Sequence, residues 1–297
     1  MNNSIASNPS IKIRSYLLHL THYDPPWSAD KSKEQPFELP VALSLVDELV
    51  KVGFNTLVVG VSDGVEYKSH PEFKRHYSVP MEQLNELCAY ARGKGLDIIP
   101  KLNFSRSAIN CHNHWMRAPG QEWHVHFDDP HYWATAFEVI DELIGVCQPK
   151  HYFHVGMDED HDRSYTQFVD ALLVLHEGLT KRQLRTVAWS DSSLDYPSGQ
   201  IYREKSELAE TRLPKDCIRI LWNYWAQPAA TMQQITNQGL ELWGAPGWKD
   251  AAQVTGFKNA LLAAGGNGLI MTRWIACQKC NQEQLIKQIR ELGPLYH

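Results

Sequence analysis

Three consecutive acids, Asp158, Glu159 and Asp160, follow the short apolar run Phe153–Met157. Like charges repel one another, so this arrangement at the end of what reads as a buried strand calls for a physical reason. A neighbouring negative charge raises the pKa of a carboxyl group, and a carboxylic acid that keeps its proton near neutral pH can act as a general acid. Asp158 and Glu159 are therefore candidate catalytic residues. The alternative is a solvated acidic loop that caps the next helix.

Apolar segments with strand character alternate with segments of helical periodicity along the chain. We expect strands at Lys12–Leu20, Asn55–Val61, Leu96–Phe104, His151–Met157, Leu184–Ser190, Cys217–Trp225, Leu240–Gly244 and Asn267–Trp274. We expect helices at Pro40–Gly53, Val79–Gly95, His131–Cys147, Tyr165–Thr180, Ala229–Gln238, Asp250–Ala264 and Gln282–Leu292, with a short helix before the sixth strand. This alternation in 297 residues predicts an α/β fold, a single closed (β/α)8 TIM barrel. An open doubly wound sheet is the alternative, but no glycine-rich phosphate loop follows the first strand.

The composition is that of a globular protein, with 43% hydrophobic residues and a net charge of -5. The chain has no basic block and no apolar stretch of about 18 residues, so we expect no nucleic-acid partner and no membrane span. No signal-like apolar segment stands at the N-terminus and the cysteines are scattered, which favours a cytoplasmic location. We expect residues 1–10 to form a disordered tail, residues 11–297 to form the barrel, and the protein to pair as a homodimer.

Side chains at the carboxyl ends of barrel strands form the active site in this fold. Here those ends carry acids, amides and many of the 10 tryptophans. Carboxylates can act on a glycosidic oxygen, and aromatic rings supply flat apolar walls with a polar edge. The sequence therefore predicts a carbohydrate site. The residues that we expect to line it are Asp63, Asn103, Trp189, Asp191, Trp222, Tyr224, Trp225, Trp243 and Trp274.

The six residues His154 to Glu159 read H-V-G-M-D-E and resemble the H-x-G-G-D-E signature of glycoside hydrolase family 20, the β-N-acetylhexosaminidases. Arg14 matches an arginine that grips sugar hydroxyls from the first strand of that family. Ser62-Asp63, Tyr90–Asn103 and Trp189–Asp191 resemble family segments at the second, third and fifth strands, in the right order.

The resemblance implies an exo-acting, retaining enzyme that removes β-linked N-acetylglucosamine or N-acetylgalactosamine with the help of the substrate's own 2-acetamido group. Glu159 would be the general acid and base, Asp158 would orient the acetamido nitrogen, and Tyr224 would donate to the acetamido oxygen. The walls of the acetamido pocket would come from Trp189, Trp222 or Trp225, and Trp243 or Trp274. No metal or cofactor is implied.

The chain also departs from the family pattern. Lys101 and Asn103 stand where the family has Glu and Asp, a family histidine is missing from the same segment, and Ala276 replaces a glutamate that holds the outer sugar hydroxyls. We expect His112 or His114 to take over from the missing histidine. The departures predict altered recognition of the 4- and 6-hydroxyls.

Other interpretations stay open at this point. The chain could be a non-catalytic glycan-binding barrel or a related glycosidase with altered specificity. A metal site could be assembled from His151, His154, His161, Asp158 and Asp162. A leaving-group subsite could be formed by Trp115, Trp123 and Trp133, which could equally pack the third loop.

Overall fold

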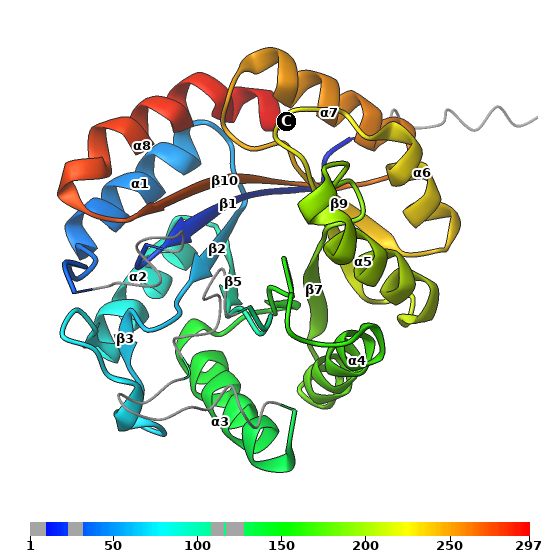
Figure 1. Cartoon of the computed structure of the whole chain (residues 1–297). Coiled ribbons are helices and arrows are strands. Elements are labelled where there is room, and N and C mark those ends of the chain that lie inside the picture. Colours follow the sequence, from blue (N-terminus) through cyan, green and yellow to red (C-terminus); the bar gives the residue numbers. More distant parts are fainter. Residues whose placement is uncertain (1–9, 23–31, 108–115, 117–127) are drawn as a thin grey trace, which may run out of the picture.

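A computed structural model of the chain describes residues 10–22, 32–107, 116 and 128–297. In this part of the chain, parallel strands close into a barrel in the order β1-β10-β9-β8-β7-β6-β5-β2, and eight α-helices surround it (Figure 1). The predicted (β/α)8 barrel is confirmed. None of the described helices combines the length and the apolar character that crossing a membrane requires.

The elements agree with the predicted alternation. The barrel strands are β1 (Ile13–His19), β2 (Thr56–Gly60), β5 (Asp97–Lys101), β6 (Tyr152–His154), β7 (Arg185–Ser190), β8 (Ile218–Trp222), β9 (Glu241–Ala245) and β10 (Gly268–Ala276). The helices are α1 (Leu39–Lys51), α2 (Met81–Gly93), α3 (Pro130–Cys147), α4 (Tyr165–Lys181), α5 (Gln200–Arg212), α6 (Ala229–Asn237), α7 (Ala251–Ala263) and α8 (Lys279–Leu292). A two-stranded sheet of β3 (Val65–Glu66) and β4 (Val79–Pro80) lies between β2 and α2.

Helix α5 is longer than the short helix expected before the sixth strand, since it runs for 13 residues. Its buried face includes Lys205, Ser206 and Glu210, so polar residues occupy positions that are usually apolar in an amphipathic helix. The apolar periodicity that reveals the other helices is therefore weak in α5.

The barrel closes where its first strand, β1, pairs with its last strand, β10. β1 pairs in parallel with β10, through Ile13 and Gly268, and with β2, through Ser15 and Thr56. α1 and α8 lie side by side outside these strands (Figure 1). Because all the strands run in one direction, their carboxyl ends gather at one end of the barrel and their amino ends at the other.

Trp243 fills the amino-terminal end of the barrel interior. Its ring lies 5.2 Å from that of Tyr152, and its Nε1 donates to Glu241 Oε1 at 3.1 Å. A Cβ on Gly268 would lie 2.5 Å from the indole. Tyr152, Glu241 and Gly268 all begin their strands, so this position does not fit the expected role of Trp243 in a sugar pocket.

Replacing Gly268 with alanine should therefore destabilise the barrel. The new methyl group overlaps a fully buried, rigid indole, and overpacking of this kind costs about 1–3 kcal/mol of the free energy of unfolding. Urea denaturation would measure the loss. The matched control is Gly145→Ala in α3, where nothing lies within 4 Å of the added Cβ; this variant should gain up to about 1 kcal/mol from helix propensity. Equal stability of the two variants would contradict the packing argument.

Candidate active site

The chain turns sharply directly after β6. Gly156, Met157 and Glu159 have φ values of 70°, 71° and 49°, in the left-handed region that residues other than glycine rarely adopt. A Cβ on Gly156 would lie 2.2 Å from Asn103 Oδ1, so glycine is also required by space. Strained backbone of this kind persists only where surrounding contacts enforce it, and such sites are often functional.

Asn103 fixes the turn and Asp158 together. Its Oδ1 accepts hydrogen bonds from the main-chain N–H groups of Met157 at 2.9 Å and Ser105 at 3.0 Å. The amide nitrogen of Asn103 consequently faces Asp158, and it donates to Asp158 Oδ1 at 2.6 Å. Asn103 therefore positions Asp158, and its expected contact with sugar stays a prediction.

Asp191 ties together the ends of β6, β7 and β8. Its Oδ2 accepts from the main-chain N–H of Glu159 at 2.9 Å, and its Oδ1 accepts from Trp222 Nε1 at 2.7 Å. Burial, with the negative charge of Asp158 as a second cause, raises the pKa of Asp191 to about 7. A carboxyl group that titrates near neutral pH therefore lies beside the two candidate catalytic acids.

The third acid of the cluster, Asp160, has a structural role. It is buried, and its Oδ2 accepts from Arg163 Nη1 at 2.7 Å and from the main-chain N–H of Arg106 at 2.7 Å. Lys205 Nζ, from α5, lies 3.4 Å from Asp160 Oδ1. Its charge is thus compensated by two buried cations, as buried carboxylates require.

Buried polar side chains form the floor beneath Asp158. Lys101 ends β5 and pairs in register with His154 on β6. Burial lowers the pKa of Lys101 to about 8, although Asp158 opposes the shift. Burial and the Lys101 charge lower the pKa of His154 well below its usual value, so the imidazole is neutral. His154 Nε2 and Trp189 Nε1 are buried without a hydrogen-bond partner in the described chain, which is unusual for buried polar atoms.

Aromatic rings from β7, β8 and β10 form a wall above this floor. The rings of Trp189 and Trp274 lie 6.0 Å apart, and Trp274 Nε1 donates to the Tyr224 hydroxyl at 2.8 Å. The ring of Tyr224 lies 5.4 Å from that of Trp222. The structure thus brings together four of the expected aromatic residues.

Trp225 lies at the rim. Its exposed fraction is 66%, its ring is 5.6 Å from that of Tyr224, and Lys249 Nζ lies 4.2 Å from its ring centroid. Such an exposed ring suits a stacking platform outside a pocket better than a pocket wall.

Arg14 lies away from this group. It stands near the start of β1, and its guanidinium donates to the main-chain oxygens of Gly53 at 2.8 Å and Ile11 at 3.2 Å. These contacts are at the amino-terminal end of the barrel, so the expected grip of Arg14 on sugar hydroxyls does not fit its position.

Asp63 is near the mouth but buried in its own loop. It accepts hydrogen bonds from the Tyr77 hydroxyl at 2.6 Å and from Thr21 Oγ1 at 3.4 Å, and Arg75 Nε lies 3.8 Å away. Its contacts with Tyr77 and Arg75 hold the segment between β2 and α2 together.

Some expectations fall outside this group or outside the described residues. Trp133 packs in α3 against Tyr132, with ring centroids 4.9 Å apart. The residues His112, His114, Trp115 and Trp123 lie outside the described residues. In the described ranges, the histidines and acids around β6 do not form a metal-binding group.

Two tyrosines beyond β7 were missed at the sequence level. Burial raises the pKa of Tyr202 to about 12, and the negative charge of Glu159 is the next cause. Burial and then Glu159 raise the pKa of Tyr196 as well. Both tyrosines thus lie within electrostatic reach of Glu159. In the sequence, these tyrosines are marked only by their place after the fifth predicted strand. Tyr202 lies in α5, where the apolar periodicity is too weak to indicate which side chains are buried.

The raised pKa of Asp191 predicts a specific pH dependence of stability. The folded protein holds this proton up to about pH 7, whereas an unfolded aspartate loses it near pH 3.9. Ionisation of Asp191 therefore costs stability as the pH rises between these values. The free energy of unfolding of Asp191→Asn, relative to that of wild type, should rise by up to about 1.4 kcal/mol per pH unit over this range. Above the range the difference should stay constant.

Urea denaturation at a series of pH values would measure this difference. Because an amide has only one acceptor oxygen, the variant also loses the hydrogen bond from Glu159 or the one from Trp222, which adds an offset that does not vary with pH. Asp195→Asn, which removes an exposed carboxylate four residues away, is the matched control for the loss of one negative charge. Parallel pH profiles for Asp191→Asn and wild type would overturn the assignment.

Solved structures of family 20 enzymes share this architecture. An exo β-N-acetylglucosaminidase from Vibrio harveyi in complex with N-acetylglucosamine is 12% identical, with a TM-score of 0.63, over 97% of this chain and 54% of that chain. A mutant β-hexosaminidase from Streptomyces plicatus in complex with the product GlcNAc is 13% identical, with a TM-score of 0.67, over 97% and 64%. A β-N-acetylhexosaminidase from Bacteroides fragilis is 12% identical, with a TM-score of 0.68, over 97% and 66%.

This chain spans between about half and two thirds of the length of those structures. No protein-family model matches it, and no curated protein matches it. At these identities the likeness concerns the fold, and it agrees with the resemblance of the β6 segment to the family signature. The chain therefore has the barrel fold of the glycoside hydrolase family 20 enzymes.

Proposed function

We propose that this chain is an exo-acting, retaining β-N-acetylhexosaminidase for terminal β-linked N-acetylglucosamine or N-acetylgalactosamine. The observation that carries the proposal is the turn after β6, where Asn103 holds Asp158 and Asp191 holds the main chain of Glu159. This turn lies beside an aromatic wall that suits a sugar ring. Carbohydrate bound in the Vibrio and Streptomyces structures of the same fold supports this substrate class.

In the proposed reaction the substrate supplies its own nucleophile. The 2-acetamido oxygen attacks the anomeric carbon and the bond to the leaving oxygen breaks, while Glu159 protonates that oxygen. An oxazolinium ion results. Glu159, now a carboxylate, takes a proton from water. The water oxygen attacks the anomeric carbon and opens the oxazolinium ring, which restores the acetamido group. The anomeric configuration is retained and Glu159 recovers its proton.

Asp158 would act on the acetamido group during both steps. It accepts the acetamido N–H, which orients the carbonyl oxygen for attack and stabilises the positive charge that develops on the ring. Asn103 makes this possible by fixing the carboxylate with a 2.6 Å hydrogen bond. Trp189, Trp222 and Trp274 would enclose the acetamido methyl group, and the Tyr224 hydroxyl would bind the acetamido oxygen.

A glycan-binding barrel without turnover, or a glycosidase of altered specificity, is the second candidate. The buried cation Lys101 favours this candidate, because Lys101 stands where the family pattern has a glutamate and lies close enough to Asp158 for the Asp158 charge to oppose the lowering of the Lys101 pKa. Ala276 likewise offers no carboxylate for the outer hydroxyls. The homodimer and the cytoplasmic location stay predictions of the sequence.

Hydrolysis of 4-nitrophenyl β-glycosides would separate these functions. We expect turnover of the N-acetylglucosamine or N-acetylgalactosamine substrate but not of glucose, because only an N-acetyl sugar carries the nucleophile. Glu159→Gln should lower kcat by about 100- to 10,000-fold, the usual contribution of a general acid. Asp162→Asn, which removes an exposed carboxylate from the same loop, is the matched control and should keep its activity.

Each contrary outcome has a distinct meaning. Equal turnover of the glucoside would exclude acetamido participation. Full activity of Glu159→Gln would remove Glu159 from the mechanism. Saturable binding of N-acetyl sugars without turnover would favour the binding-protein function.

Trp225 at the rim and Trp222 in the aromatic wall should respond differently to replacement by alanine. Trp225→Ala should raise KM for a β-linked disaccharide about tenfold, equivalent to about 1.4 kcal/mol, with kcat nearly unchanged, because a rim contact binds substrate and transition state alike. Trp222→Ala should lower kcat as well, since it removes a hydrogen bond to Asp191. Steady-state kinetics of both variants would test this, and a loss of kcat in Trp225→Ala would place Trp225 in the pocket.

A further inference from the structure

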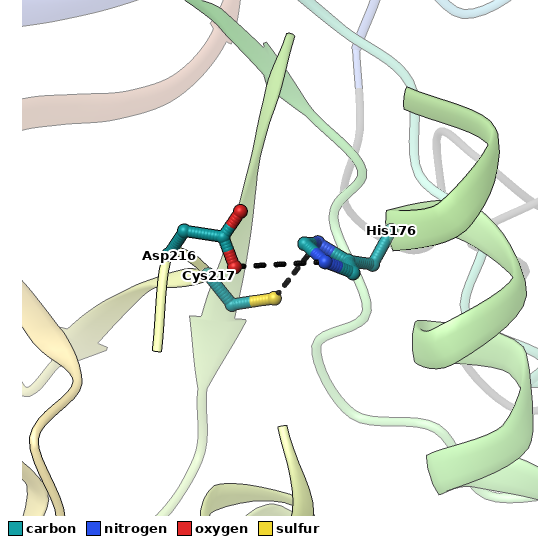
Figure 2. A group of neighbouring side chains, drawn as sticks. All are labelled: His176, Asp216 and Cys217. Carbon is teal, nitrogen blue, oxygen red and sulfur yellow. Dashed lines mark hydrogen bonds and ion pairs between the residues drawn. The ribbon is translucent and has the colours of Figure 1, made fainter. Parts of the chain in front are cut away.

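A second group of side chains with metal-ligating atoms lies at the amino-terminal end of the barrel, between the strands and the helices. His176 comes from α4, and Asp216 and Cys217 come directly before β8 (Figure 2). Cys217 Sγ lies 3.2 Å from His176 Nδ1, and Asp216 Oδ1 lies 3.6 Å from His176 Nε2. Among the described residues, this is the group of His, Cys and acidic side chains whose ligand atoms all lie within 4.8 Å of one another.

We propose that His176, Asp216 and Cys217 bind a zinc-like transition-metal ion through one imidazole nitrogen, one carboxylate oxygen and one thiolate. Zinc is borderline-soft and accepts all three ligand types, usually in tetrahedral sites. A water molecule would complete the coordination. The hard cations Mg²⁺ and Ca²⁺ take oxygen ligands, so a buried thiol does not suit them.

The spacing of the ligand atoms suits such an ion. Zinc binds sulfur at about 2.3 Å and nitrogen at about 2.0–2.1 Å, so two tetrahedral ligands stand roughly 3.6 Å apart. The Sγ–Nδ1 distance of 3.2 Å is close to that value. Because the two imidazole nitrogens face in different directions, the ion should bind Nδ1, which faces the sulfur.

Asp216 would complete the site by turning its carboxylate from Nε2 of His176 toward an ion on Nδ1. Arg185 Nε donates to the main-chain oxygen of Asp216 at 3.0 Å, which anchors this residue. The Asp216 side chain is 54% exposed and can therefore rotate toward an ion on Nδ1. Another Arg185 nitrogen pairs with Glu241 at 2.8 Å, which compensates the arginine charge near the site.

The metal-free group is poorly suited to nucleophilic chemistry, although a Cys–His–Asp array can activate a thiol in some enzymes. Burial raises the pKa of Cys217 to about 12, the negative charge of Asp216 adds to the shift, and Arg219 and Arg185 oppose it. The thiol is therefore protonated and inert at neutral pH. An incoming metal ion would displace one proton from Cys217 as the metal–sulfur bond forms, so binding must be linked to pH.

Titration of the chelator-treated, full-length protein with Co²⁺ tests this proposal. We expect one ion per chain, with visible bands of tetrahedral cobalt and a near-ultraviolet band of cobalt bound to thiolate. Zn²⁺ should displace the cobalt and thereby remove the visible bands and the near-ultraviolet band.

Variants assign the ligands. Cys217→Ser should abolish the thiolate band, and Cys280→Ser, which alters an exposed cysteine, should keep it. His176→Gln and Asp216→Asn should each weaken binding by at least about tenfold, with folding checked by circular dichroism. The proposal is overturned if wild type shows no thiolate band, if the band persists in Cys217→Ser, or if folded His176→Gln binds cobalt as tightly as wild type.

Discussion

Three adjacent carboxylates can exist at the end of β6 because the fold gives each of them a different environment. Asp160 lies in the protein interior against Arg163 and Lys205. Asp158 is held by Asn103, and the main chain of Glu159 is held by Asp191. The left-handed turn that begins at Gly156 aims these residues apart. The rest of the site depends on this turn, because it decides which acids reach the barrel mouth and which one supports the loop.

The charge balance beneath the mouth also follows from burial. Asp158 lies close enough to Asp191 for its negative charge to contribute to the raised pKa of Asp191. Lys101 adds a buried positive charge on the adjoining strand, and His154 stays neutral beside it. Asn103 brings an N–H donor to Asp158 where the family pattern has another acid. These substitutions lower the negative charge of the floor while keeping Asp158 in a defined orientation.

The two ends of the barrel have different physical roles. At the amino-terminal end, Trp243 packs over Gly268 and Arg14 bonds to main-chain oxygens, so these large side chains hold the strands together. At the carboxyl end, Trp222 and Trp274 donate hydrogen bonds to the loop residues Asp191 and Tyr224, and Trp189 packs against His154 and Trp274. A rigid base allows the strained turn after β6 to persist, since strain needs a surrounding structure that resists relaxation.

The sequence by itself determined the alternation of strands and helices, hence the barrel, and the placement of Asp158, Glu159 and Asp191 at strand ends. Both follow from local patterns, namely apolar periodicity and the residues that come next in the chain. Only the tertiary structure decided that Trp243 and Arg14 lie at the far end, that Asn103 serves Asp158, and that Asp160 is buried. It also brought His176 to Cys217 across 41 residues. Strand register and contacts between distant segments set these outcomes, and neither is encoded in local periodicity.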